Sequence, residues 1–116
     1  MKLKVIVAGG RKYNDYITAS KVLDQIPKPF DVVCGEAAGA ETLGKRYALE
    51  NGWKIHSFPA QWDAHGKSAG YIRNKQMAEF ADALVAFWDG SSKGTKHMID
   101  LARSNNLKVF IVNYDN

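Results

Sequence analysis

Three glycine-containing turns follow short apolar runs, at residues 9–11, 35–40 and 89–95, and their composition suits them to phosphate binding. Glycine lets backbone N–H groups approach an anion closely, and the start of a following helix adds unpaired donors and partial positive charge. Turns between strands and helices also use glycine and serine for conformation alone. Three such turns at one edge of a sheet favour a ligand site.

A charged residue, Arg73, falls on an otherwise apolar helix stripe with Ala69, Met77 and Phe80. Its guanidinium contacts an anionic ligand, extends to the solvent at the rim, or pairs with one of the carboxylates Asp63, Asp82 and Asp89. Arg11 is either a ligand contact or an exposed turn residue. The full set of predicted ligand-binding residues is Gly9, Gly10, Arg11, Gly35, Glu36, Gly39, Ala40, Arg73, Asn74, Trp88, Asp89, Gly90, Ser91, Gly94 and Thr95.

Three aromatic residues, Trp62, Tyr71 and Trp88, offer flat faces for a purine, and each could equally pack in the core or in a lid. Trp88 is the best placed, at the end of a strand. The carboxylate of Asp89 could accept a hydrogen bond from a ribose hydroxyl or cap its own turn. Neither GxGxxG nor GxxxxGK[ST] occurs, which disfavours a standard dehydrogenase or P-loop NTPase.

Cysteine and histidine spacing gives no metal site, because Cys34 is the single cysteine and His56, His65 and His97 lack ligand spacing. The net charge is +4, from 16 Lys and Arg against 12 Asp and Glu, and these residues are scattered. Such a surface is weak evidence for nucleic acid and is compatible with a small anion. No membrane span or signal peptide is recognisable, so we expect a cytoplasmic protein.

Apolar runs and glycine breaks predict an α/β fold for residues 1–116 as a single domain. The expected strands are residues 3–8, 31–34, 53–58, 83–88 and 108–113, and the expected helices are about 15–25, 41–50, 69–81 and 95–104. Residues 59–68 lack periodicity and are expected to form a loop. This alternation predicts a Rossmann-like three-layer sandwich with a five-stranded parallel sheet in order 3-2-1-4-5. Ligands bind such sheets where the strand order reverses, between the first and fourth strands.

The combined motifs resemble the YspA/YpsA-related branch of the SLOG superfamily, a Rossmann-like group that includes the LOG phosphoribohydrolases and the DNA-processing protein DprA. The residues that carry the resemblance are 9–15, 35–41, 59–62, Gly66, 69–70, 73–74, Met77, 81–83, 89–90 and 94–95. The resemblance implies a pocket for a nucleotide or a nucleotide-derived ligand. In LOG-like enzymes an Arg before the fourth strand and a Glu after it carry N-glycosidic cleavage.

This chain matches the family Arg at Arg73, but the catalytic Glu position falls on Met98, which can act neither as an acid nor as a base. Two other departures are Glu36, where relatives have glycine, and Glu41, where they have Asp. We therefore expect a binding protein, for sensing or sequestration, with a ligand such as ADP-ribose, NAD, AMP or a signalling nucleotide. No other cofactor is expected, and the resemblance implies a homo-oligomer.

Two other functions remain open from the sequence. The first is a nucleotide-processing enzyme, an N-glycosidase or phosphohydrolase, in which Arg73 acts with Glu36, Glu41 or Asp89 in place of the missing Glu. The second is DprA-like binding of single-stranded DNA, motivated by an isoelectric point near 9.2 and several aromatic residues.

Overall fold

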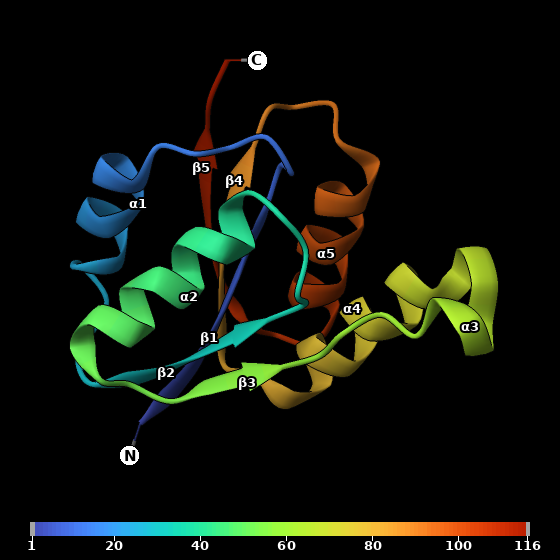
Figure 1. Cartoon of the computed structure of the whole chain (residues 1–116), viewed down its shortest axis with the longest axis horizontal. Helices are drawn as coiled ribbons and strands as arrows, with labels where there is room; N and C mark the ends of the chain where they lie inside the picture. Colours follow the sequence, from blue (N-terminus) through green and yellow to red (C-terminus); the bar gives the residue numbers. More distant parts are fainter. Residues whose placement is uncertain (1, 116) are drawn as a thin grey trace.

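Five parallel strands form the centre of the protein, whose computed structural model describes residues 2–115 (Figure 1). The strands are β1 (Leu3–Gly9), β2 (Phe30–Cys34), β3 (Ile55–Ser57), β4 (Ala83–Trp88) and β5 (Lys108–Asn113). Their order in the sheet is β3-β2-β1-β4-β5, which confirms the predicted Rossmann-like arrangement. The central strand β1 pairs with β2 through residues 3–6 and with β4 through residues 5–9.

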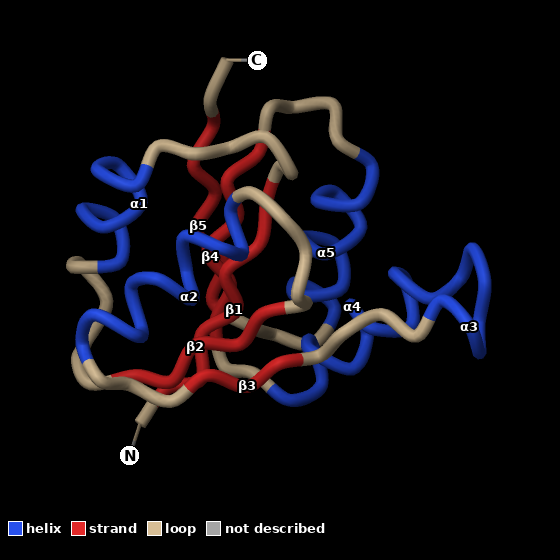
Figure 2. The backbone as a smooth tube through the Cα atoms, in the orientation of Figure 1, coloured by secondary structure: helices blue, strands red, loops and turns tan. Residues whose placement is uncertain are grey.

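Helices cover both faces of the sheet, with α1 (Tyr16–Leu23) and α2 (Ala40–Asn51) on one side and α4 (Ala69–Phe80) and α5 (Lys93–Ser104) on the other (Figure 2). Successive side chains of β1 point to opposite faces of the sheet, and because those of residues 5–8 are all apolar, both faces of the sheet are apolar there. Val5 and Val7 pack toward α1 and α2, whereas Ile6 and Ala8 pack toward α4 and α5. The two helical layers therefore hold two separate cores against one sheet.

Local signals set the helix ends. The side chain of Asp15 accepts from the N–H of Thr18 at 3.1 Å and begins α1, while Ser92 caps α5. Gly52 ends α2 in the left-handed conformation, as its Asn-Gly sequence predicts. No helix within residues 2–115 is long and apolar enough to cross a bilayer.

Residues 59–68 depart from the predicted loop. They contain the short helix α3 (Trp62–His65) and a 3-10 turn at Gly66–Ser68, and every residue of both is exposed. Figure 1 shows α3 set away from the sheet. A single helical turn that buries no stripe has no hydrophobic period, which is why the sequence pattern did not reveal it.

The third strand is shorter than the predicted 53–58. The N–H of Trp53 donates to the carbonyl of Ala48 at 2.9 Å, and its ring packs against Phe30 and Tyr47, so it belongs to the end of α2. The first helix likewise ends at Leu23 instead of near residue 25. The sheet order is unaffected by these differences.

Candidate ligand-binding cleft

A cleft of about 360 Å³ opens at the carboxyl edge of the sheet, where the turns after β1, β2 and β4 meet. This is the point where β1 lies between β2 and β4, and the connecting helices pass to opposite faces. Open α/β sheets bind ligands at this position. The lining residues are Ala8, Gly9, Arg11, Ala37, Glu41, Trp62, Lys67, Gly70, Tyr71, Arg73, Asn74, Ser92, Gly94, Thr95 and Met98.

Two glycines allow the first two turns to meet backbone to backbone. Gly39 has a φ of +79°, and a Cβ there would overlap the carbonyl oxygens of Gly10 and Arg11. The next residue, Ala40, donates its N–H to the Gly10 carbonyl at 3.2 Å. A side chain at Gly9 would in turn overlap the carbonyl oxygen of Phe87 on β4. The close packing of the backbone at the floor of the cleft therefore requires glycine at both positions.

Arg73 reaches from α4 to the end of β2, where its Nη1 donates to the carbonyl oxygen of Gly35. Its Nε donates to Oδ1 of Asn74 at 3.0 Å. A Cβ on Gly35 would fall on the guanidinium, so this glycine makes room for Arg73. Among residues 2–115, no ion pair joins Arg73 to Asp63 or Asp82, two of the three carboxylates that the sequence offered as partners.

The cleft is predominantly cationic. Arg11 and Lys67 are both exposed at its rim, and Arg73 lies half-buried inside it. Against these three cations stands one lining carboxylate, Glu41. The start of α5 adds the hydroxyls of Ser92 and Thr95, and helix N-termini favour anions. The arrangement suits a ligand that carries negative charge.

Glu41 is a buried carboxylate, only 5% exposed, on the first turn of α2. Its Oε2 accepts from the N–H of Ala37 at 2.6 Å. Burial raises the pKa of Glu41, while the backbone donors and the nearby Arg73 oppose that rise. A carboxylate held in this way can accept hydrogen bonds from a bound ligand or take part in acid–base chemistry.

Asn74 links Arg73 to His97 across the α4–α5 interface. Because Oδ1 of Asn74 accepts from Arg73, its amide nitrogen is the donor toward Nδ1 of His97, at 3.2 Å. The His97 ring also makes an edge contact with Tyr71, and partial burial lowers the pKa of His97. These contacts favour a neutral imidazole with its proton on Nε2.

This lowered pKa makes a prediction about acid stability. Below the ordinary histidine pKa of 6.5, the unfolded chain binds a proton at His97 that the folded chain resists, so the free energy of unfolding falls as pH drops. We expect His97→Gln, which keeps an acceptor for Asn74, to lose less stability than the wild type between pH 7.5 and 5.5 in urea unfolding. If both proteins lose the same free energy of unfolding over this pH range, the pKa of His97 is not lowered in the folded protein.

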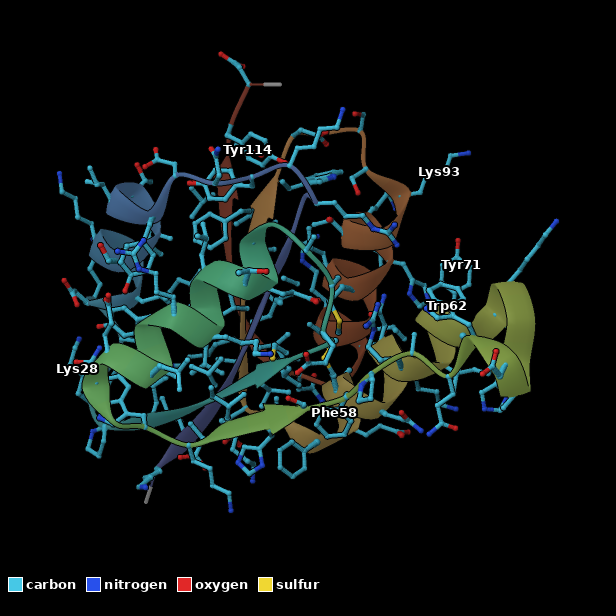
Figure 3. All side chains as sticks on the ribbon, viewed as in Figure 1. Lys28, Phe58, Trp62, Tyr71, Lys93 and Tyr114 are labelled. Carbon is cyan, nitrogen blue, oxygen red and sulfur yellow. The ribbon has the colours of Figure 1, made fainter. Side chains whose placement is uncertain are left out.

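The aromatic side chains at the cleft are Trp62 and Tyr71, which lie beside each other near the start of α4 (Figure 3). They are 52% and 51% exposed, so about half of each side chain is accessible to a ligand. Trp88, the sequence-based choice for a base platform, does not line the cleft. Its Nε1 donates to the carbonyl of Ser92 at 3.1 Å and so supports the turn before α5.

The remaining predicted residues fall into two groups. Gly35 and Glu36 line a smaller hollow next to the cleft. The others belong to the turns but line neither space, and they are Gly10, Gly39, Ala40, Asp89, Gly90 and Ser91. Oδ1 of Asp89 accepts hydrogen bonds from the N–H of Ser91 at 2.9 Å and from the N–H of Ser92 at 2.8 Å. Sequence reasoning did not single out five lining residues, although two of them, Ala37 and Ser92, lie in turns predicted to bind phosphate; the other three are Ala8, Lys67 and Gly70. The cap position of Ser92 was a usable signal, whereas Lys67 lies in the stretch without periodicity.

Glu36 occupies a backbone conformation that favours glycine, with a φ of +63°. Its carboxylate is held by Nζ of Lys45 at 2.9 Å and by the hydroxyl of Ser57 at 2.5 Å. These contacts, together with the ordered turn, offset the strain of a left-handed non-glycine residue. The fold thus accommodates Glu36 at a position where the family resemblance implies glycine.

Comparing two variants at this position separates the strain from the ion pair. Both Glu36→Ala and Glu36→Gly lose the Lys45 contact, but only alanine keeps the left-handed strain. We expect the glycine variant to be more stable than the alanine variant by about 1 kcal/mol in urea unfolding. Equal stability of the two would show that this turn relaxes freely.

The structure is that of a Rossmann-like α/β domain with a cleft at the switch point of its sheet. The sequence model of the YAcAr family, described as the YspA, cpYpsA-related SLOG family, matches residues 3–65, and the chain belongs to this family. It is also similar to the Gene 61 protein of Mycobacterium phage D29, with 32% identity over 91% of this chain and 93% of the phage protein. No solved structure matches significantly. Membership of a SLOG family indicates a nucleotide-related function.

Proposed function

We propose that the protein binds a nucleotide or nucleotide-derived ligand in the cleft at the carboxyl edge of its sheet. The observation that carries this proposal is the convergence of Arg11, Lys67 and Arg73 on one cleft that also receives the N-terminus of α5. Phosphate oxygens accept hydrogen bonds from guanidinium groups and from helix N-termini. The volume of about 360 Å³ lies within the range of small-molecule sites.

The same cleft supplies the other contacts that a nucleotide needs. Phosphate groups would lie near Ser92, Gly94 and Thr95, with charge neutralised by the arginines. The exposed rings of Trp62 and Tyr71 suit stacking of a base. The neutral side chain of Met98, at the position of the LOG catalytic Glu, also lines the cleft. These features support binding, for sensing or sequestration, over LOG-type hydrolysis.

One observation favours a second candidate function, that of a nucleotide-processing enzyme. Glu41 lines the cleft as a buried carboxylate with a raised pKa, and it lies close enough to Arg73 to interact electrostatically. A carboxylate in this position could stabilise positive charge on a ribose ring during N-glycosidic cleavage. Glu41→Gln would abolish turnover if this candidate is correct.

Mass spectrometry distinguishes the two functions. Purified protein is incubated with NAD, ADP-ribose, AMP and cyclic nucleotides, and the retained and free fractions are analysed separately after denaturation. Recovery of an intact retained ligand is the expected result for a binding protein. Release of a free base or a ribose phosphate would instead establish an enzyme. If the protein neither retains nor converts any compound of this panel, the proposed function is wrong.

A further inference from the structure

A second hollow of about 280 Å³ adjoins the cleft and shares part of its wall. Arg11, Ala37, Trp62 and Arg73 line both spaces. The rest of the second hollow is formed by the turn after β2 and the segment before α3, through Gly35, Glu36, Ala38, Pro59 and Ala60. The cleft therefore has two lobes, an α5 lobe of about 360 Å³ and this smaller β2 lobe.

The shared wall between the lobes carries two guanidinium groups. Arg11 is exposed, and within residues 2–115 its side chain forms no ion pair or hydrogen bond. Arg73 uses Nε and Nη1 to bind Asn74 and Gly35. A guanidinium has five N–H donors, so Arg73 retains donors after these two bonds. The shared wall can therefore donate hydrogen bonds to an anionic group that lies between the two lobes.

The two lobes differ in chemistry. The α5 lobe has the hydroxyls of Ser92 and Thr95 and the ring of Tyr71. The β2 lobe has turn backbone, the apolar side chains of Pro59 and Ala60, and the carboxylate of Glu36, which is held by Lys45 and Ser57. Trp62 borders both. Each lobe taken alone is near the small end of the size range of ligand sites, which suits one nucleoside-sized group in each.

We propose that the ligand is a two-part molecule in which two sugar- or base-bearing groups flank a phosphate bridge, as in ADP-ribose or a dinucleotide. The phosphate bridge lies on Arg11 and Arg73, beside Ser92, Gly94 and Thr95 at the start of α5, and the two sugar- or base-bearing groups extend from it into the two lobes. This inference rests on the proposed function and narrows it, because a mononucleotide such as AMP fills one lobe only. The β2 lobe is then the part of the site that selects against mononucleotides.

Calorimetric titration with AMP, ADP, ADP-ribose and NAD tests the inference. We expect ADP-ribose or NAD to bind at least about tenfold more tightly than both AMP and ADP, where ADP controls for the charge of the diphosphate. Ala60→Phe places a ring in the β2 lobe and should remove this preference while leaving AMP affinity unchanged. Ala64→Phe, on an exposed position of α3 outside both lobes, is the matched control and should change neither affinity.

Three results would overturn the inference. If AMP or ADP binds as tightly as the two-part ligands, or if Ala60→Phe weakens AMP and ADP-ribose equally, the site takes a single nucleotide and the proposed function stands. If no nucleotide binds to the wild type, the proposed function itself fails. Ala38→Phe, at an exposed position that also lines the β2 lobe, replaces Ala60→Phe if that variant proves unstable.

Discussion

Replacing Arg73 by alanine is expected to weaken ADP-ribose binding by roughly 10- to 100-fold, measured by calorimetric titration. Arg73 is half-buried and borders both lobes of the cleft, so its remaining N–H donors face any phosphate bound between them. Hydrogen bonds to charged groups contribute about 1.5–3 kcal/mol, and 1.4 kcal/mol corresponds to a factor of ten in affinity.

Two further variants separate ligand binding from structure. Arg73 also donates to the Gly35 carbonyl, so Arg73→Ala should lower the free energy of unfolding by about 1 kcal/mol, and affinities must be compared where the variant is fully folded. Arg73→Lys keeps the charge but loses the planar fork, and we expect an intermediate affinity. Lys75→Ala removes a cation from an exposed position of the same helix and should leave affinity unchanged. If the Arg73→Ala protein is folded and binds ADP-ribose as tightly as the wild type, Arg73 does not contact the ligand.

Replacing Gly39 by alanine is expected to lower the free energy of unfolding by about 3 kcal/mol, measured by urea denaturation. The φ of +79° is strained for any residue with a side chain, and the new Cβ would overlap the carbonyl oxygens of Gly10 and Arg11. Both atoms belong to backbone and cannot move aside alone. The turns after β1 and β2 would have to separate, which also opens the floor of the cleft.

Gly52→Ala provides the matched control for this effect. Gly52 has a similar φ of +69°, but a Cβ there meets no atom within 4 Å. Its substitution should therefore cost only the left-handed strain, about 1 kcal/mol. Equal losses at the two positions would show that the close approach of the two turns contributes nothing to stability.

The sheet and its order could be predicted from sequence because the strands lie in short apolar runs that alternate with helical segments and end near turn residues. The edge of the sheet that carries the site followed from the same pattern, as did the places of Arg11 and Arg73 in the cleft. What the pattern lacked was information on exposed segments. α3 buries nothing, so neither its helix nor the contribution of Lys67 to the cleft left a periodic signal.

Trp88 shows a different limit of sequence reasoning. Its place at the end of β4 was predicted correctly, but position along a strand determines only the face of the sheet to which a side chain points, and not whether the side chain reaches the cleft. The indole N–H donates to the carbonyl of Ser92, which directs the ring to the turn before α5 and leaves Trp62 and Tyr71 at the cleft. Distinguishing these three rings required the tertiary contacts.

The central place of β1 has a consequence for how the chain folds during synthesis. β1 leaves the ribosome before the other four strands, yet one of its two neighbours, β4, ends at Trp88. Until that residue emerges, a nascent sheet of β1, β2 and β3 has an open apolar edge, and pairing across such a long stretch of chain is slow. Nascent chains that stall before β4 should therefore be more prone to aggregation than chains that have passed it.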